Sequence, residues 1–331
     1  MAKTVKTAFD EFLREYVNLD PSNSLGARNS RDWLINKIDA FQDDDDSFPH
    51  LHPSKKIFFG SFARKTKIRE LDDIDIMIII HAQSSKHEDH GDHVKIKVQD
   101  SANRLKRLCF DGTNTLNSRK VIEKFLSNLK KVSHYEKAEI KRQGEAATLK
   151  LSSYSWNFDI VPCFGANKNP WPNDCYLIPD GDGNWKRTDP RIDRDRVTSI
   201  NTSHNGKVLN VIRIMKYWNK RPTMPSMNSY LLENLILNYY ETNESSEYVD
   251  VEVAKILAYI SHTIYQPVMD PKEIQGDLNQ LTTEQRRKIS DRALSDFQKA
   301  SEAIHLEKDG EIESSIKKWG EIFGSNFPKY E

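Results

Sequence analysis

The stretch from residue 57 to residue 80 constrains the fold of this 331-residue chain more than any other. It reads IFFGSFARKTKIRELDDIDIMIII, with a short apolar start, a Gly60-Ser61 pair, a basic polar segment and a second apolar run that opens with two acids. We interpret it as a short strand, a turn and a buried second strand. Glycine lets a backbone approach a phosphate closely, and consecutive amides in a turn can form an anion-binding concavity. The turn at Gly60 and Ser61 is therefore a candidate phosphate-binding site.

Asp73 and Asp75 open the second strand. Side chains in a strand alternate between faces, so the two carboxylates share one face and Ile74 and Ile76 share the other. Carboxylates on one face repel each other, and Mg²⁺, which binds carboxylate oxygens together with substrate phosphates, would relieve the repulsion. A bare Asp-x-Asp is more often a solvated pair, and a bare Gly-Ser is more often an ordinary turn. The two together, at this spacing, favour a metal and phosphate site.

A third acid lies in the apolar run WNFDIVP, at Asp159. An unpaired buried carboxylate is costly, so an acid amid Phe, Ile and Val needs a reason to be there. One reason is a buried salt bridge. The other is that this strand lies beside the Asp73 strand and completes a metal site. Two Mg²⁺ ions, with Mn²⁺ as a possible substitute, can stabilise the attacking and leaving oxygens of phosphoryl transfer.

The composition describes a globular protein with 37% hydrophobic and 30% charged residues and a formal net charge of zero. Proteins that wrap long nucleic acid usually carry a basic excess, so the balance argues against that class but not against small nucleotides. Neither a signal peptide nor an apolar run of membrane-spanning length is evident. Three scattered cysteines without a C-x-x-C pair fit free thiols in a reducing compartment. We therefore expect a cytoplasmic protein.

Periodicity and turn residues predict the elements of the first half. We expect a helix near residues 9–17, helices over 30–41 and 121–132, and strands over 138–140, 148–151 and 156–161. The polar segment 84–92 is predicted to be a mobile surface loop, although His87, His90 and His93 also allow a metal site. Residues 165–195 are rich in Pro, Asn, Gly and Asp, which predicts a long connection between two lobes.

From residue 206 onward the pattern is helical, with helices expected over 208–218, 229–240, 249–265, 283–304 and 312–323. Thr282 and Gln285 form a capping-box pattern. Lys216 lies in an otherwise apolar helix, so it either contacts a phosphate or extends to the surface along its apolar stem. Ser229 and Tyr230 open the next helix, whose N-terminus favours phosphate. Tyr230 could stack on a base or belong to the core.

Several of these stretches, in this order, resemble the bacterial CD-NTases, the cGAS/DncV-like (SMODS-type) nucleotidyltransferases of antiphage signalling. That family belongs to the polymerase-β-like superfamily and is related to oligoadenylate synthetase. The matching stretches are GSFARKTKI, DDIDIMIII, the Gln143-Gly144 pair followed by FDIVP, the YLIP…TDP segment from Tyr176 to Pro190, VIRIMKYWN, SYLLE and KKWGEIFGSNFP. The resemblance implies an α+β fold: a nucleotidyltransferase core of mixed sheet and flanking helices at residues 1–205, then a C-terminal helical lobe at 206–331. The active site would lie in the cleft between them.

By position, the resemblance makes Asp73, Asp75 and Asp159 the catalytic and metal-binding residues. It makes Gly60 and Ser61 the residues that hold the donor triphosphate.

Further along the chain, Lys216 and Ser229 match residues that contact phosphates in relatives, and Tyr230 matches one that stacks on a base. Lys65 stands where many relatives have glycine. The metal-binding insertion of the animal sensor is absent, so direct binding of long double-stranded DNA is not expected. The C-terminal end does not resemble a conjugation site.

The resulting prediction is a Mg²⁺-dependent enzyme that joins NTPs, ATP and/or GTP, into a cyclic di- or trinucleotide second messenger and releases pyrophosphate. The resemblance implies antiphage (CBASS-type) signalling through a downstream effector protein that binds the product, without a membrane partner. One alternative is a linear oligoadenylate synthase or a nucleotidyltransferase acting on an RNA or protein acceptor. Another is a non-catalytic nucleotide-binding regulator, against which the intact acid set argues.

Overall fold

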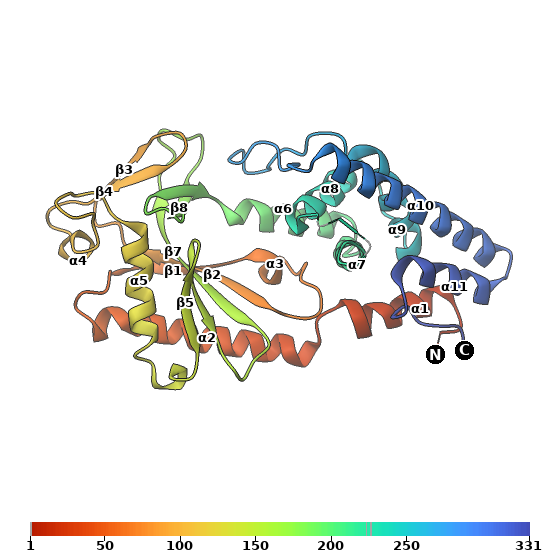
Figure 1. The fold of residues 1–331 in the computed structure, drawn as a ribbon, viewed down its shortest axis with the longest axis horizontal. Coiled ribbons are helices and arrows are strands. Elements are labelled where there is room, and N and C mark those ends of the chain that lie inside the picture. The colour runs from red at the N-terminus through yellow and green to blue at the C-terminus, as the bar shows by residue number, and fades with distance from the viewer. Residues whose placement is uncertain (1, 223, 226) are drawn as a thin grey trace. The chain divides into compact units, whose positions relative to one another are not determined.

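The computed structural model describes residues 2–222, 224–225 and 227–331 and shows a mixed α+β fold (Figure 1). The chain forms two compact units. The sheet unit comprises Pro21–Ala63 and Glu70–Arg191, and the helical unit comprises Met1–Asp20, Arg64–Arg69 and Ile192–Glu331. The predicted fold class, a mixed sheet with helices and a C-terminal helical part, is confirmed.

A mixed sheet in the order β1-β2-β7-β8-β9-β4-β3 forms the centre of the sheet unit, and β5 and β6 extend it from β7. β2 and β7 run parallel, whereas the other paired strands run antiparallel. The strands are β1 (Leu51–Phe59), β2 (Asp73–Ile80), β3 (Lys86–Asp89), β4 (Val94–Lys97), β5 (Glu139–Gln143), β6 (Ala146–Lys150), β7 (Asn157–Ala166), β8 (Cys175–Pro179) and β9 (Trp185–Thr188).

The apolar run in β2 is explained by its central position between β1 and β7. Ile74 and every residue from Ile76 to Ile80 are buried, whereas Asp73 and Asp75 are half-buried. A strand that is covered on both faces becomes a continuous apolar run instead of an alternating one. Only its first residues keep the alternation, and the two acids stand there.

Two long helices pack on this sheet: α2 (Pro21–Asp44) contacts β1, and α5 (Ser118–Leu129) contacts β5 to β8 (Figure 1). Their shared core includes Phe48, whose ring lies 5.4 Å from that of Phe41 in α2 and 4.9 Å from that of Phe125 in α5, measured between centroids. Shorter helical segments are α3 (Gly60–Ala63), α4 (Asn103–Lys106) and η2 (Ser133–Tyr135).

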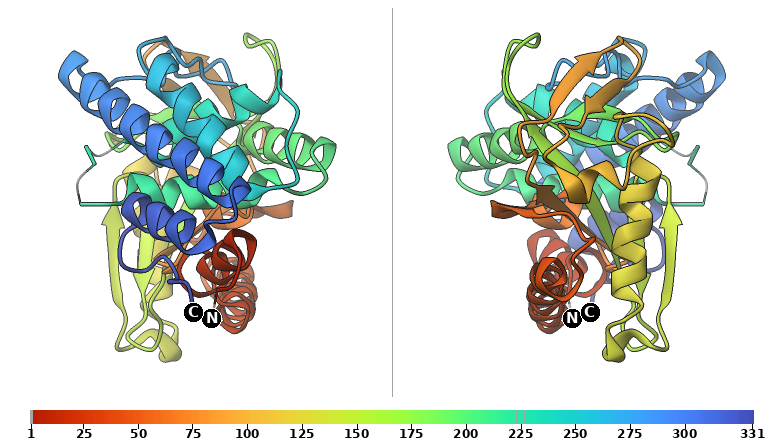
Figure 2. Two further views of the ribbon diagram at one scale, coloured as in Figure 1. Left: turned by 90° about the vertical axis from the view of Figure 1, so that its right-hand side faces the viewer. Right: turned by 90° about the vertical axis from the view of Figure 1, so that its left-hand side faces the viewer.

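The helical unit is built around one apolar core that α10 helps to close by packing along both α9 and α11 (Figure 2). Its N-terminal helix contributes Phe9 and Phe12, which pack against Trp319, Phe323 and Phe327 near the C-terminus. The helices are α1 (Val5–Phe12), the π-helix η1 (Leu13–Val17), α6 (Pro190–Ser203), α7 (Val208–Asn219), α8 (Ser229–Tyr240), α9 (Val249–Thr263), α10 (Thr283–Lys308) and α11 (Ile312–Phe323).

This packing explains why the compact units have other bounds than the predicted division after residue 205. The first helix, predicted to belong to the core of residues 1–205, carries an aromatic face that is buried among C-terminal helices. The division into a catalytic core of residues 1–205 and a helical lobe of residues 206–331 stays a prediction, whereas compactness assigns residues 192–205 to the helical unit.

The predicted C-terminal helices are confirmed, with α8 and α11 having the predicted bounds and Thr282 and Gln285 forming the predicted capping box. One loop prediction is wrong, because residues 84–92 include strand β3. The connection predicted over residues 165–195 contains β8, β9 and the start of α6, and the boundary between the two compact units falls within it, after Arg191. The helix predicted over 30–41 is longer at both ends, since α2 spans Pro21–Asp44. None of the helices in the described residues is long and apolar enough to cross a membrane.

Lys65 has a φ of 61°, in the left-handed region. Its side chain is exposed, so no packing offsets the strain, which costs an L-residue roughly 1–2 kcal/mol. Glycine removes the strain but loses roughly 0.5–1 kcal/mol to backbone entropy. We expect Lys65→Gly to raise the free energy of unfolding by up to about 1 kcal/mol, measured by urea denaturation.

Lys137 provides the control, because it is also exposed and its φ is not positive. Lys137→Gly should lower the free energy of unfolding by roughly 0.5–1 kcal/mol. Equal losses in both variants would contradict strain at Lys65.

Candidate active site

Asp75 and Asp159 stand directly opposite each other on neighbouring strands. In the parallel register of β2 and β7, Asp75 pairs with Asp159, and Asp73 pairs with Asn157. Paired residues of adjacent strands point to the same face of a sheet. The prediction that the Asp159 strand lies beside the Asp73 strand is therefore confirmed, and the three acids share one face at the start of β2.

Thr148 of β6 fixes the orientation of the Asp159 carboxylate. The Thr148 hydroxyl donates a hydrogen bond of 2.7 Å to Oδ1 of Asp159, and the two residues are register partners across β6 and β7. Thr148 is buried, so this donor is held by packing as well as by pairing. Asp159 therefore keeps a defined rotamer, which a ligand carboxylate requires.

Gly60 lies directly against the Asp75 carboxylate. Its φ is 70°, and a Cβ placed on it would lie 1.7 Å from Oδ2 of Asp75 and 2.6 Å from its Cγ. Phe59, the residue before it, is the β1 partner of Asp75 in the sheet. The turn that begins at Gly60 and continues into Ser61 of α3 is thus pressed onto one of the acids. Only glycine satisfies both the backbone angle and the space.

These residues fit a divalent cation that is bound together with a phosphate ligand. Carboxylates accept and do not donate, and Mg²⁺ is commonly held by one or two of them plus phosphate oxygens. The register gives Asp75 and Asp159 as the adjacent pair, with Asp73 one step away on the same face. Among the described residues, no group of three or more His, Cys, Asp or Glu is gathered as for a metal cage, and that holds for His87, His90 and His93 too.

The other three predicted residues belong to the helical unit. Lys216 is buried, with a side chain 5% exposed, and it forms an ion pair with Glu233 of α8. Its ammonium also donates to the carbonyl oxygen of Thr66, at 3.1 Å, and to the Thr66 hydroxyl, at 3.3 Å. The alternative that Lys216 extends to the surface is wrong, because its side chain is buried and its head group contacts Glu233 and Thr66 inside the unit. Its contact with a phosphate stays a prediction.

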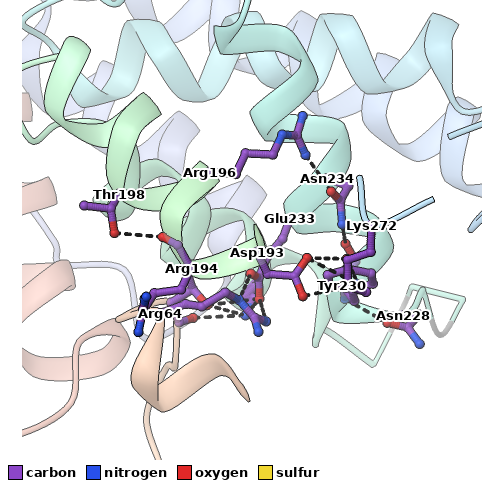
Figure 3. Close-up of polar contacts among 12 residues, drawn as sticks. Arg64, Asp193, Arg194, Arg196, Thr198, Asn228, Tyr230, Glu233, Asn234 and Lys272 are labelled. Atoms are coloured by element: carbon purple, nitrogen blue, oxygen red, sulfur yellow. Dashed lines mark hydrogen bonds and ion pairs between the residues drawn. The ribbon is translucent and has the colours of Figure 1, made fainter. Parts of the chain in front are cut away.

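Glu233 is the centre of this network. Arg64 donates to both of its oxygens, at 3.0 Å and 3.2 Å, and the Thr66 hydroxyl donates to Oε1 at 3.0 Å (Figure 3). Burial alone would raise the pKa of Glu233, but Arg64 and Lys216 outweigh it and lower that pKa. The pKa of Lys216 is lowered, because burial and the neighbouring cations Arg64 and Lys67 outweigh the single carboxylate.

Tyr230 lies in a second charged cluster beside the first. Its hydroxyl donates to Asp193 at 2.5 Å and contacts Asp270 at 3.2 Å, and Lys272 contacts the same hydroxyl (Figure 3). The Lys272 ammonium lies 4.3 Å from the centre of the Tyr230 ring, and the Arg64 guanidinium carbon lies 5.8 Å from it. Burial and Asp193 raise the pKa of Tyr230, so it stays a neutral phenol. Stacking on a base stays a prediction.

Ser229 is the first residue of α8 and is exposed, as its predicted place at a helix N-terminus requires. The cap itself is Asn228, whose side-chain oxygen accepts a hydrogen bond of 2.7 Å from the Tyr230 amide. The phosphate role of Ser229 is an expectation from the resemblance.

Sequence reasoning did not single out Glu233, Thr148, Asp193 or Lys272. Glu233 had a usable signal: it stands inside the apolar run LLENLIL, and the argument applied to Asp159 applies to it as well. Asp193 and Lys272 carry no local signal, because their partners are distant in the sequence. Thr148 lies 11 residues before Asp159, but nothing in the sequence sets it apart from any other threonine of a strand.

Comparison with known proteins adds the family. No family model matches the chain. A protein of Bacillus cereus (strain VD146) named "Probable cyclic nucleotide synthase" is 42% identical over 332 residues, covering 100% of both chains. Among solved structures, CdnC of E. coli MS115-1 in complex with HORMA-deltaN has a TM-score of 0.71 at 17% identity and covers 98% of each chain. CdnC with ATP gives 0.70 at 18% identity, with 98% of each chain covered.

The GTP-bound form of DncV from Vibrio cholerae has a TM-score of 0.68 at 12% identity and covers 98% of this chain and 96% of that one. The fold is thus that of the solved CdnC and DncV structures. With 42% identity over the full length to a cyclic nucleotide synthase, the chain belongs to the bacterial CD-NTase family. The prediction that it is an enzyme of this kind is confirmed.

Replacing Gly60 tests the contact with Asp75. Gly60→Ala must displace the Asp75 carboxylate, because the new Cβ would lie 1.7 Å from its oxygen. Misplacing a reacting group by about 1 Å can lower a rate roughly 100-fold. We expect at least that loss in NTP incorporation, measured with α-labelled nucleotides.

Gly144→Ala is the matched control, since Gly144 also has a positive φ, 55°, but nothing lies within 4 Å of its added Cβ. This variant should lose about 1 kcal/mol of stability from backbone strain and retain its activity. Similar activities in the two variants would contradict the proposed packing of Gly60 on Asp75.

Glu233→Gln tests the buried charge network. The pKa of Glu233 is lowered in the folded protein, so its ion pairs stabilise the fold above its unfolded pKa of about 4.3 and this stabilisation is lost as pH falls through the lowered value. Removing one member of a buried pair costs roughly 3–5 kcal/mol. We expect Glu233→Gln to lower the free energy of unfolding by this amount at pH 7. We expect the loss to shrink when urea denaturation is repeated at lower pH, toward pH 2.

Glu241→Gln serves as the comparison, because Glu241 pairs with Arg196 while its side chain is 49% exposed. Exposed pairs contribute about 0–1 kcal/mol, so its deficit should be small throughout. A Glu233→Gln deficit as small as this, or independent of pH, would argue against the network.

Proposed function

We propose that this CD-NTase joins NTPs into a cyclic oligonucleotide, a di- or trinucleotide second messenger, and releases pyrophosphate. The observation that carries the proposal is the contact between the Gly60 turn and Asp75, with Asp159 opposite Asp75 in the sheet. A turn suited to phosphate and two acceptor-only side chains meet at one place. This is the combination that phosphoryl transfer requires, because such catalysis consists of positioning and charge stabilisation.

Asp73, Asp75 and Asp159 would hold Mg²⁺, or Mn²⁺ in its place. When bound, the cation would neutralise triphosphate charge and lower the pKa of the acceptor ribose hydroxyl. The amides at Gly60 and Ser61 would hold the donor triphosphate, because a glycine backbone exposes its N–H groups to a phosphate. Thr148 would keep Asp159 oriented while the acceptor hydroxyl loses its proton and attacks the α-phosphorus.

In the helical unit, Lys216 and Ser229 would contribute positive potential and hydrogen bonds to the substrate phosphates, and Tyr230 would stack on a base. For Lys216 the structure sharpens the proposal. Its head group is bonded to Glu233 and Thr66, so it would act through its charge or after a local rearrangement. Ser229 needs no rearrangement, because it is exposed at the start of α8.

ATP and GTP are the proposed substrates, because related folds have been solved with ATP and in a GTP-bound form. The proposed setting is antiphage signalling in the cytoplasm, with an effector protein that binds the product. The described cysteines, Cys109, Cys163 and Cys175, are free and buried, in keeping with a reducing compartment. The HORMA-deltaN complex of CdnC supports looking for a protein partner as well.

Asp75→Asn tests the function directly. The substitution keeps the shape of the side chain and removes its charge, so we expect product to disappear while the fold remains. The assay is purified protein with Mg²⁺ and all four NTPs, followed by phosphatase treatment and mass spectrometry. The control is Asp309→Asn, an exposed acid at the end of α10, which should leave product formation unchanged.

A phosphatase-resistant species at the mass of a cyclic di- or trinucleotide supports the proposal. A phosphatase-sensitive ladder indicates linear oligonucleotides, and label transferred to added cell extract indicates a macromolecular acceptor. Product formation by Asp75→Asn would reject the assignment of the site.

A further inference from the structure

The helical unit contains a cavity of about 370 Å³ that the proposed reaction does not use. It lies between the end of α7, the end of the 64–69 segment and the residues after α11. Three cations line it: Arg69, Lys220 and Arg221. Of the described residues that line this cavity, none is an aspartate or glutamate. This stands out in a chain whose formal net charge is zero.

The cations are held in place by the backbone. Arg69 donates from Nε to the carbonyl oxygen of Asn18, at 3.0 Å, and from a terminal nitrogen to that of Arg14, at 3.1 Å. Arg221 is bonded to the carbonyl oxygen of Glu321 at 3.5 Å. A carbonyl orients a guanidinium without neutralising it, so the positive charge of both side chains stays available to a ligand.

Arg221 shows that this charge is incompletely balanced. Burial and the neighbouring Arg292 lower its pKa, and Asp296 only partly offsets them. Arg64 is more deeply buried, yet its carboxylate partner Glu233 raises its pKa. The difference lies in the partners: Arg64 is bonded to the carboxylate of Glu233, whereas Arg221 is bonded to a backbone carbonyl, and a bound anion would supply Arg221 with a negative partner.

The cavity also offers neutral hydrogen-bond groups and an apolar wall. The Tyr217 hydroxyl accepts a hydrogen bond of 3.0 Å from Asn326 and therefore keeps its own proton to donate. Ile68, Pro222 and Phe323 form the apolar side. The volume is at the small end of the range for ligand pockets, roughly 300–1,000 Å³.

We propose that this cavity is a second phosphate-binding site that takes a small phosphorylated ligand such as a nucleoside monophosphate. The phosphate pairs with Arg69, Lys220 and Arg221, and the organic part packs on the apolar wall. Lys220 caps the C-terminus of α7, four residues after Lys216. Arg69 follows Thr66, which contacts Glu233, in the 64–69 segment. A ligand here therefore acts on the same two elements as the buried network.

The test is isothermal titration of the full chain with sodium pyrophosphate and with AMP, in buffer without divalent cations. It needs no catalysis, so its outcome does not depend on the proposed reaction. Each lost charge-assisted contact should weaken binding roughly tenfold. We expect Lys220→Gln, a change at an exposed residue, to do so, and Lys220→Gln with Arg221→Gln to abolish measurable binding. Arg221→Lys, made in protein that keeps Lys220, should retain most of the wild-type affinity.

Two controls separate this site from others. Lys308→Gln removes an exposed lysine of α10 in the same unit and should leave the affinity unchanged. Gly60→Ala distorts the turn of the predicted triphosphate site and should also leave the affinity unchanged. Affinity that is lost in Gly60→Ala, or retained in the double variant, overturns the proposal, as does wild-type protein that binds neither anion. Binding of duplex DNA alone, abolished by the same double variant, would also overturn it by assigning the cations to nucleic acid.

Discussion

The parallel register of β2 with β7 is the constraint on which the candidate site depends. A slip of one residue would turn every side chain of a strand to the opposite face. Ile74 and Ile76 on β2, and Phe158 and Ile160 on β7, are fully buried, so a slip would expose apolar side chains and bury acids. The hydrophobic core thus holds Asp75 opposite Asp159 more firmly than any direct contact between two like charges could.

Gly60 connects this register with the chemistry. Its backbone occupies the space beside Asp75 where any side chain would collide with the carboxylate. The close approach brings turn amides and acids together, which is what a triphosphate with its counter-ions would need. The same close approach means that Gly60 cannot be replaced without strain, because steric fit and positive φ both exclude other residues. Folding and function therefore require the same residue at this position for related physical reasons.

Local patterns allowed much of this to be predicted from the sequence. The apolar run of β2, the embedded Asp159 and the five C-terminal helices follow from periodicity alone. Strands β3, β8 and β9 did not, because each is four or five residues long and rich in turn-forming or charged neighbours. The buried contacts of Lys216 could not be predicted for another reason. Its partner Thr66 is 150 residues away, and no spacing rule reports a contact that only the tertiary fold creates.

The two charged clusters of the helical unit show what stabilises contacts between residues that are far apart in the sequence. Around Glu233 two cations share one carboxylate, whereas around Tyr230 one cation, Lys272, pairs with two, Asp193 and Asp270. Each cluster alone carries an unbalanced charge, which is expensive in a buried setting. Arg64 lies over the Tyr230 ring and contacts Glu233. The excess positive charge of the Glu233 cluster therefore faces the excess negative charge of the Tyr230 cluster. The charges of the two clusters together sum to zero, so a charge-changing substitution in either cluster alters the electrostatic energy of both.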